Sequence, residues 1–174
     1  MQNLTALLEK FPSLKVLCVG DAMLDTFIYG KVERISPEAP VPVFKKTREV
    51  SMLGGVGNVA ANIAALGAKV SAVARVGRDA DGEKIACLMK SGGISARLAA
   101  RDGVPTTAKT RIVSANTHIL RIDDEEIAPP SPEELAEAKR AVSEEIADAD
   151  IAVLSDYGKG FVSGELAAFV VEKA

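Results

Sequence analysis

The stretch from Leu53 to Gly67 combines residue types that suit contact with a small polar ligand. Gly54, Gly55 and Gly57 come before Asn58 and a segment of small residues. Glycine lets the backbone turn freely and lets a ligand approach the main chain. A helix that begins directly after such a loop presents unpaired N–H groups, and the asparagine amide both donates and accepts hydrogen bonds. A tight loop leading into a buried helix explains these residues equally well, so both interpretations stay open.

Two pairs of charged residues follow predicted strands. Asp21 and Asp25 come after the apolar run Lys15–Gly20, and Asp156 and Lys159 follow a second such run. Because ligands of open α/β sheets bind beyond the carboxyl ends of strands, these side chains are candidate ligand contacts. Turn formation and helix capping are alternative roles for the first two, and we expect function more strongly at Asp25 than at Asp21.

Three cations fall on two strand-like segments, 106–113 and 117–122. They are Lys109, Arg111 and Arg121. Ammonium and guanidinium groups on successive strands suit a phosphate, which they bind through charge-assisted hydrogen bonds. A solvated strand face is the alternative, and the sequence does not decide between the two.

The composition narrows the function classes. The 174 residues include 21 basic and 24 acidic side chains without a basic block, which gives nucleic-acid binding no electrostatic support. No apolar run approaches the roughly 18 residues of a membrane span, and no basic segment suggests a secretion signal. Cys18 and Cys87 are predicted to be reduced core residues of a cytoplasmic protein. His118 is the single histidine, which excludes a histidine-rich metal site.

Alternating strands and helices position these residues. Buried strands are predicted at 15–20, 69–76 and 151–154, and a further strand-like run at 95–99. Helices are predicted at 3–10 with Asn3 as cap, at 57–66, from the loop 77–82 to Lys90, at 132–147 after a capping box, and after Ser163. This alternation predicts an α/β fold. The last helix should lead into another parallel strand, so we expect residues 1–174 to be the amino-terminal part of one larger domain.

The segment between Tyr29 and Val50 has a different character. Three prolines, Pro37, Pro40 and Pro42, exclude a central strand. Short strands at 41–43 and 47–53 are predicted to pair with each other. We therefore expect a small β-flap of residues 31–53, together with strands within 106–122, that projects from the α/β body.

Several of these motifs resemble the ribokinase-like (PfkB-type) sugar kinases. The run Gly54-Gly55-Val56-Gly57-Asn58-Val59-Ala60, with Gly67 and Gly77 after it, looks like the family's first signature. The segments 20–25, 34–43 and 154–160 are similar, more narrowly, to the heptose 7-phosphate kinases, which are often joined to an adenylyltransferase. The resemblance covers about residues 15 to 165. It implies a three-layer α/β/α fold with a mostly parallel central sheet and a projecting β-lid, whose carboxyl-terminal part is absent from this sequence.

The resemblance also implies an activity, which is transfer of phosphate from ATP, with Mg²⁺, to the anomeric hydroxyl of D-glycero-β-D-manno-heptose 7-phosphate. The product would enter ADP-heptose and lipopolysaccharide synthesis. The β-lid would close over the sugar and form a homodimer contact. By motif position the sugar would be held by Asp25, Gly54, Gly55 and Asn58, its phosphate by Lys109 and Arg111, and Asp156 and Lys159 would face it.

The catalytic apparatus of this family lies mostly in its carboxyl-terminal half. Family members carry the general base in a Gly-Ala-Gly-Asp loop, and an Asn-x-x-Glu motif is associated with magnesium. Neither motif occurs in the 174 residues, so no catalytic residue is assigned here and the base is expected beyond residue 174. Because phosphoryl transfer depends on positioning and electrostatic stabilisation, we expect this chain alone to be inactive.

Two alternatives remain open at this stage. One is another ribokinase-like sugar or sugar-phosphate kinase, and the other is a non-catalytic sugar-binding or dimerisation module that uses the flap as its interface. A dinucleotide-binding domain fails on position, because the glycine loop follows the flap instead of the first buried strand.

Overall fold

Strand β1 (Lys15–Gly20) lies in the middle of the body with both faces covered. In the computed structural model, which describes residues 4–174, Val16 and Cys18 belong to one apolar cluster and Leu17 and Val19 to another. Successive side chains of a strand point to opposite faces, so a continuous apolar run needs a cover on each side.

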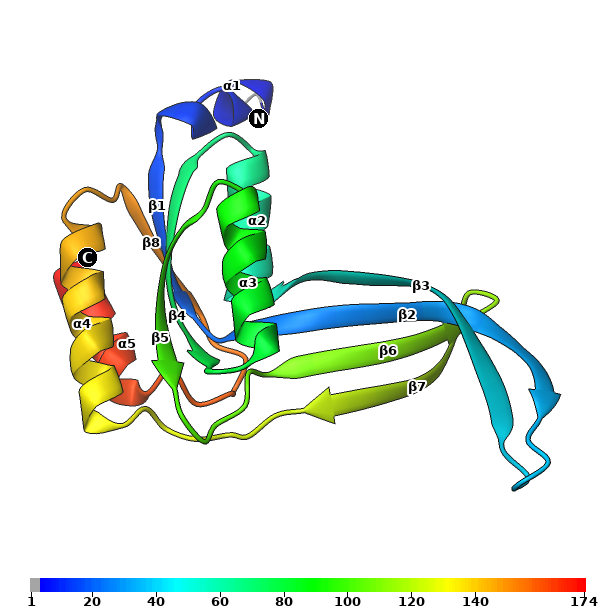
Figure 1. Ribbon diagram of the computed structural model, residues 1–174. Coiled ribbons are helices and arrows are strands. Elements are labelled where there is room, and N and C mark those ends of the chain that lie inside the picture. Colours follow the sequence, from blue (N-terminus) through cyan, green and yellow to red (C-terminus); the bar gives the residue numbers. More distant parts are fainter. Residues whose placement is uncertain (1–3) are drawn as a thin grey trace.

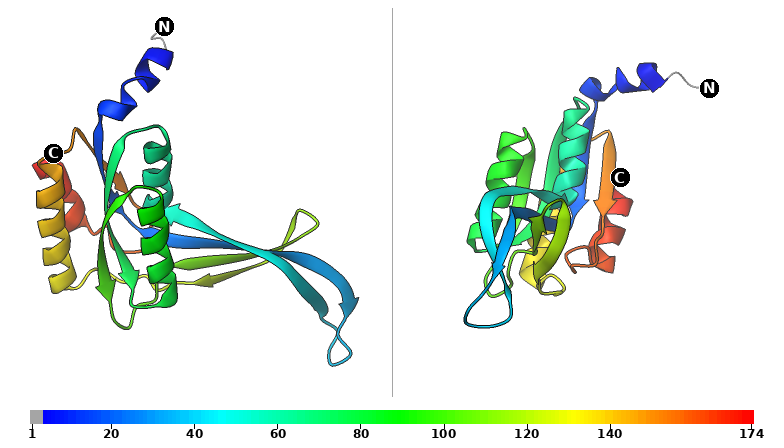
Figure 2. Two further views of the ribbon diagram at one scale, coloured as in Figure 1. Left: turned by 45° about the horizontal axis from the view of Figure 1, so that its top comes forward. Right: turned by 90° about the vertical axis from the view of Figure 1, so that its right-hand side faces the viewer.

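The body sheet is parallel throughout. It has the order β5-β4-β1-β8, in which β4 spans Lys69–Gly77, β5 spans Ser95–Arg101 and β8 spans Ile151–Ser155. Helices α2 (Val56–Ala65) and α3 (Ala80–Ser91) cover one face, and α4 (Pro132–Ile146) and α5 (Gly164–Lys173) cover the other (Figures 1 and 2). The predicted three-layer α/β/α fold is therefore confirmed.

The helix ends follow the capping signals of the sequence. Ser131 and Glu134 form the predicted capping box of α4, and Ser163 caps α5. Helix α1 (Leu4–Leu8) and a 3₁₀ turn (Phe11–Ser13) precede β1, and the predicted cap Asn3 lies outside the described residues. Within residues 4–174, none of the helices is both long and apolar enough to span a membrane.

A second sheet, which we call the lid, projects from the body (Figure 1). Its order is β3-β2-β6-β7, with β2 at Ala22–Ile35, β3 at Pro42–Gly55, β6 at Ala108–Ser114 and β7 at Thr117–Asp124. The register of the β2–β3 pair shifts twice beyond Tyr29. Such irregularities bend a strand pair, and the outer part of this hairpin turns away from β6 and β7 (Figure 1).

The lid is built differently from the predicted flap. The predicted pairing of 41–43 with 47–53 is wrong, because residues 42–43 and 47–53 belong to the single strand β3, which pairs with β2. The sequence pattern does not indicate β2, which begins at Ala22 and so includes Asp25. Pro42 is the first residue of β3, where a strand tolerates proline.

One predicted core residue, Cys87, and one predicted buried strand, β8, are also corrected. Cys18 is buried, which raises its pKa to about 11, but Cys87 is exposed because the buried face of α3 consists of Gly82, Ile85 and Met89. Strand β8 is not buried on both faces. It pairs with β1 along one edge only, and its Ile151 side chain is 44% exposed.

Candidate functional site

Gly54 and Gly55 end strand β3, and helix α2 begins at the next residue. A Cβ atom on Gly54 would lie 2.5 Å from Oδ2 of Asp25, and one on Gly55, where φ is +55°, would lie 2.1 Å from the carbonyl oxygen of Asp21. Neither position admits a side chain without a shift of its neighbours. The carboxylate of Asp25 therefore lies directly against the main chain of Gly54.

Asp25 lies within β2, although the sequence placed it beyond the end of a strand. Arg111, on the neighbouring strand β6, forms an ion pair with its carboxylate, and both side chains are 20% exposed. The Arg111 guanidinium also lies 5.1 Å from the centre of the Phe27 ring. A guanidinium has five N–H donors, so this ion pair orients the carboxylate and leaves further donors for a ligand.

Lys109 and Lys159 meet at one carboxylate. The Nζ atom of Lys109 lies 3.0 Å from Oδ2 of Asp123 and 3.1 Å from Oε2 of Glu125, and Nζ of Lys159 lies 2.8 Å from the same Glu125 oxygen. Burial lowers the pKa of Lys109, but its hydrogen bonds to Asp123 and Glu125 outweigh this, and the net shift is upward. Hydrogen bonds from Lys159 and Lys109 lower the pKa of Glu125. Lys109 and Glu125 are therefore charged at neutral pH.

Asp21 joins the loop after β8 to the start of α2. It is 2% exposed, and its carboxylate accepts backbone N–H hydrogen bonds from Tyr157, Lys159 and Phe161. Its carbonyl oxygen accepts the N–H of Val56 at 2.9 Å. Sequence reasoning ranked Asp21 below Asp25 and missed this anchoring role. The available signal was an acidic residue directly after a strand buried on both faces.

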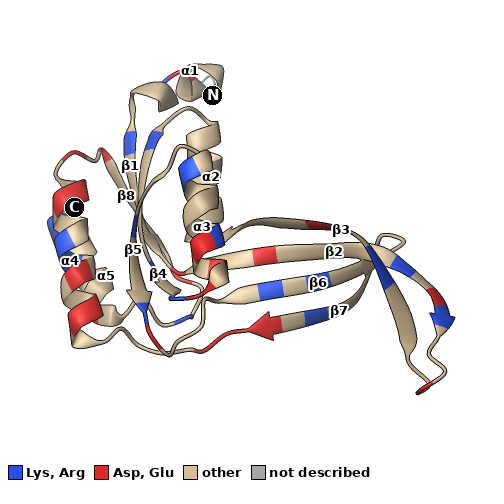
Figure 3. Ribbon diagram, viewed as in Figure 1, with Lys and Arg blue, Asp and Glu red and all other residues tan. Residues whose placement is uncertain are grey.

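The contacts connect six of the eight predicted site residues. These are Asp25, Gly54, Gly55, Lys109, Arg111 and Lys159, and Figure 3 shows charges of both signs on β2, β6 and β7 near the body. Asn58 and Asp156 lie beside this group. Asn58 is exposed on the first turn of α2, where it accepts hydrogen bonds from the Asn62 amide, and Asp156 accepts one from the N–H of Gly158.

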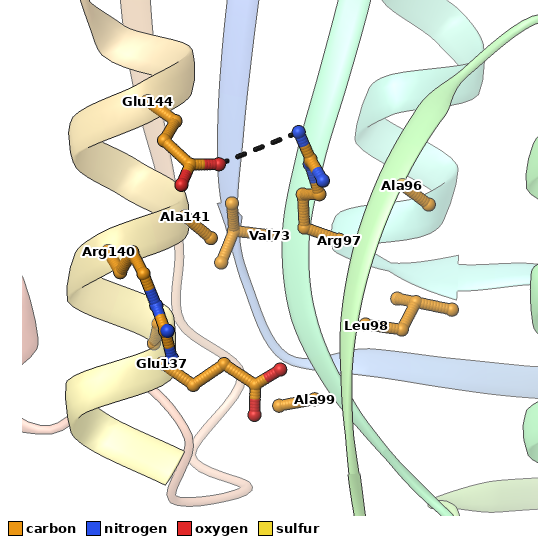
Figure 4. Close-up of a pocket in the computed structure, with 10 residues that line it drawn as sticks. Val73, Ala96, Arg97, Leu98, Ala99, Glu137, Arg140, Ala141 and Glu144 are labelled. Atoms are coloured by element: carbon orange, nitrogen blue, oxygen red, sulfur yellow. Dashed lines mark ion pairs between the residues drawn. The ribbon is translucent and has the colours of Figure 1, made fainter. Parts of the chain in front are cut away.

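A groove of about 450 Å³ lies elsewhere, between β5 and α4 (Figure 4). Its apolar lining includes Val73 and Ala99, and at its rim Arg97 pairs with Glu144 at 3.6 Å. None of the predicted site residues lines it, so it is not the candidate site.

Side chains of the types that bind metal ions do not cluster in the described part of the chain. Across residues 4–174, no group of three or more His, Cys, Asp or Glu side chains is arranged to hold a metal ion.

Comparison with known proteins identifies the family. Residues 13–174 match the pfkB family carbohydrate kinases. The chain is 44% identical over 165 residues to the bifunctional protein HldE of Gluconacetobacter diazotrophicus, covering 94% of the chain and 34% of that protein. With the bifunctional protein HldE of a Bradyrhizobium species it shares 48% identity over 160 residues, which cover 90% and 33% of the two chains. The chain thus spans about one third of the length of these curated relatives.

Solved structures share the fold. Phosphofructokinase-2 from Escherichia coli superposes with a TM-score of 0.65 at 19% identity, over 91% of this chain and 50% of that one. A carbohydrate kinase from Agrobacterium tumefaciens gives a TM-score of 0.57 at 20% identity, over 81% and 45% of the chains. With the family match over residues 13–174, we conclude that this chain belongs to the pfkB family of carbohydrate kinases.

Proposed function

We propose that this chain supplies the sugar-binding part of a cytoplasmic kinase that acts on D-glycero-β-D-manno-heptose 7-phosphate. The kinase transfers the γ-phosphate of ATP to the anomeric hydroxyl, and the product enters ADP-heptose and lipopolysaccharide synthesis. The family match supports a sugar kinase, and the curated relatives are named as bifunctional proteins, as expected where a kinase is joined to an adenylyltransferase.

The observation that carries this proposal is the Asp25 carboxylate, held against Gly54 and beside Arg111. A carboxylate accepts hydrogen bonds from sugar hydroxyls, and the two glycines let a sugar ring approach the main chain. Asn58 adds one donor and one acceptor at the start of α2. We propose that these residues hold the heptose ring.

The heptose 7-phosphate also carries an anion, for which the same region offers cations. We propose that Lys109 and Arg111 bind this phosphate, and that Asp156 and Lys159 contact the substrate from the end of β8. The Lys109 side chain is 15% exposed and that of Lys159 is 16% exposed, so their hydrogen bonds are only partly screened by water. A sugar without a phosphate has no anionic group for these cations to bind.

The lid offers a surface for a second copy of the chain. Strand β7 is an edge strand whose residues are all exposed, and its Leu120 and Ile122 side chains are 53% and 51% exposed. Burial of such apolar area is favourable by roughly 25 cal/mol per Å². We propose that the lid closes over the sugar and forms a homodimer contact.

Direct titration tests the substrate assignment. Calorimetry on the natural full-length protein should show tighter binding of heptose 7-phosphate than of the unphosphorylated heptose. The double variant Lys109→Gln/Arg111→Gln should lose about 100-fold in affinity for the phosphorylated sugar, because two charge-assisted hydrogen bonds are removed. Its affinity for the unphosphorylated heptose should fall less, because that sugar loses only the orientation of Asp25 by Arg111 and no direct contact with a phosphate. Equal losses for the two sugars would show that these cations do not bind the phosphate.

Activity measurements separate the alternatives. With ATP and Mg²⁺, preferred turnover of another sugar or sugar phosphate would indicate a different kinase of the family, and no turnover of any sugar by the full-length protein would favour a binding module. Since the Gly-Ala-Gly-Asp loop is absent from the 174 residues, we expect these residues alone to show no turnover of sugar and ATP.

A further inference from the structure

Glu125 connects the lid to the body through a single oxygen atom. Its Oε2 lies 3.1 Å from Nζ of Lys109, which is on lid strand β6, and 2.8 Å from Nζ of Lys159, which is on the body loop after β8. Two ammonium groups, one from the lid and one from a loop of the body, therefore converge on one negatively charged oxygen. This is the arrangement that a phosphate oxygen between two lysines would have.

The main chain of the two lysines is held by more hydrogen bonds than that of Glu125. Lys109 lies in β6, which is paired with a strand on each side. The main chain of Lys159 donates its N–H to Asp21 and accepts a hydrogen bond from Arg75 at its carbonyl oxygen, both at 3.1 Å. Glu125 follows the last residue of β7, in a connection that is neither strand nor helix. The main chain at both lysines is thus held by hydrogen bonds, whereas Glu125 lies in an irregular connection from which a rotation about its side-chain bonds can carry the carboxylate away.

The local charge balance makes this carboxylate a competitor for anions. Lys109, Lys159 and Arg121 are in ion pairs with Asp123 and Glu125, so three cations surround two carboxylates. Removing the charge of Glu125 doubles the small net positive charge of this group. A phosphate monoester carries a charge of about −1.5 to −2 at pH 7 and is attracted more strongly once Glu125 has turned away.

We propose that Glu125 is a placeholder for the phosphate of the sugar substrate, which takes its position between Lys109 and Lys159 on binding. This inference rests on the proposed function. The placeholder sets specificity, because an anion must displace it before it reaches the lysines. A phosphosugar gains additional contacts with Asp25 and Gly54 that offset this cost, whereas inorganic phosphate does not.

The variant Glu125→Gln removes the charge and keeps the shape of the side chain. Calorimetry on the natural full-length protein should show about tenfold tighter binding of heptose 7-phosphate, since a charge-assisted contact no longer competes. Inorganic phosphate should gain at least as much, and the unphosphorylated heptose should bind as before. The matched control is Glu126→Gln at the adjacent exposed residue, which should change each affinity less than twofold.

Unchanged or weaker binding of heptose 7-phosphate by Glu125→Gln would overturn the proposal. Either result would indicate that Glu125 merely positions the lysines, since removal of a positioning group does not raise the affinity. Glu125→Ala provides a second variant, and it should show the same gain. If wild-type protein prefers the phosphorylated heptose but neither variant tightens, this inference alone fails. If wild-type protein shows no such preference, the phosphate assignment of the proposed function fails with it.

Discussion

Replacement of Gly54 by alanine tests the central contact of the candidate site. The added Cβ atom would lie 2.5 Å from Oδ2 of Asp25 and 2.5 Å from Cγ of Met23. Real Cβ atoms essentially never show contacts below 3.0 Å, and 3.4 Å begins the ordinary range. The Asp25 carboxylate, the main chain of β3, or both must therefore move.

The size of that movement sets the expected effect. The carboxylate oxygen must retreat by roughly 1 Å, and a misplacement of that size costs on the order of 100-fold in rate where groups are positioned for reaction. A factor of 100 corresponds to about 2.7 kcal/mol. Because Asp25 is also paired with Arg111, it cannot retreat without disturbing this ion pair. We expect Gly54→Ala to lower kcat/KM for the sugar about 100-fold.

The assay is steady-state kinetics of the full-length protein with saturating ATP and varied heptose 7-phosphate. The matched control is Gly164→Ala, because a Cβ on that glycine meets nothing within 4 Å. It should leave kcat/KM unchanged. Thermal unfolding of both variants establishes that any loss of activity is not a loss of fold.

A double variant shows whether the effect passes through the carboxylate. In an Asp25→Ala background, Gly54→Ala should cost much less than in the wild type, since two changes that act on one contact are not additive. Kinetics within twofold of the wild type for Gly54→Ala would refute the reasoning. A full additional 100-fold loss in the Asp25→Ala background would refute the role of Asp25.

Two further predictions concern stability. Asp79 caps α3 by accepting the N–H of Gly82 at 2.8 Å, and it also accepts the N–H and hydroxyl of Thr106, so Asp79→Ala should lower the free energy of unfolding by about 2 kcal/mol in urea titrations. Asp81→Ala, which removes an exposed ion pair with Lys84, should cost at most about 0.5 kcal/mol. Because the pKa of Glu125 is lowered in the folded protein, its charged form contributes fully to the free energy of unfolding above the ordinary glutamate pKa of about 4.3. This contribution is lost as the pH falls through the lower pKa of the folded protein. The difference in unfolding free energy between wild type and Glu125→Gln should therefore be constant from about pH 5 to 7 and should shrink below about pH 4, and a difference that stays constant throughout would contradict the assignment.

Features that depend on neighbouring residues could be predicted from the sequence. The Ser131 capping box and the Ser163 cap of α5 each follow from a few adjacent positions. The apolar run of β1 indicates a strand covered on both faces whatever covers it. The family signature around Gly54 likewise lies in one continuous stretch.

Features that depend on pairing between distant segments could not be predicted from the sequence. Nothing local marks Ala22–Ile35 as a strand, because its order comes from β3 on one side and β6, more than seventy residues later, on the other. The predictions for Asp25 and Arg111 came from separate motifs, and their ion pair appears only when β2 and β6 lie side by side. Glu125 has no motif of its own. Its importance arises from Lys159, which comes from a different part of the fold.

The path of the chain explains why body and lid act as one site. Strand β1 ends at Gly20 and β2 begins at Ala22, so Asp21 alone separates the central strand of the body from a central strand of the lid. Its carboxylate fixes the loop that carries Lys159, and its carbonyl oxygen fixes the first turn of α2 after the glycines. Glu125 adds a side-chain connection, through Lys159, between the lid and the body, and in our proposal it is the contact that an incoming anion breaks. If the substrate phosphate replaces Glu125 as we propose, the same two lysines are held together by Glu125 before binding and by the substrate afterwards, so lid and body stay connected in both states.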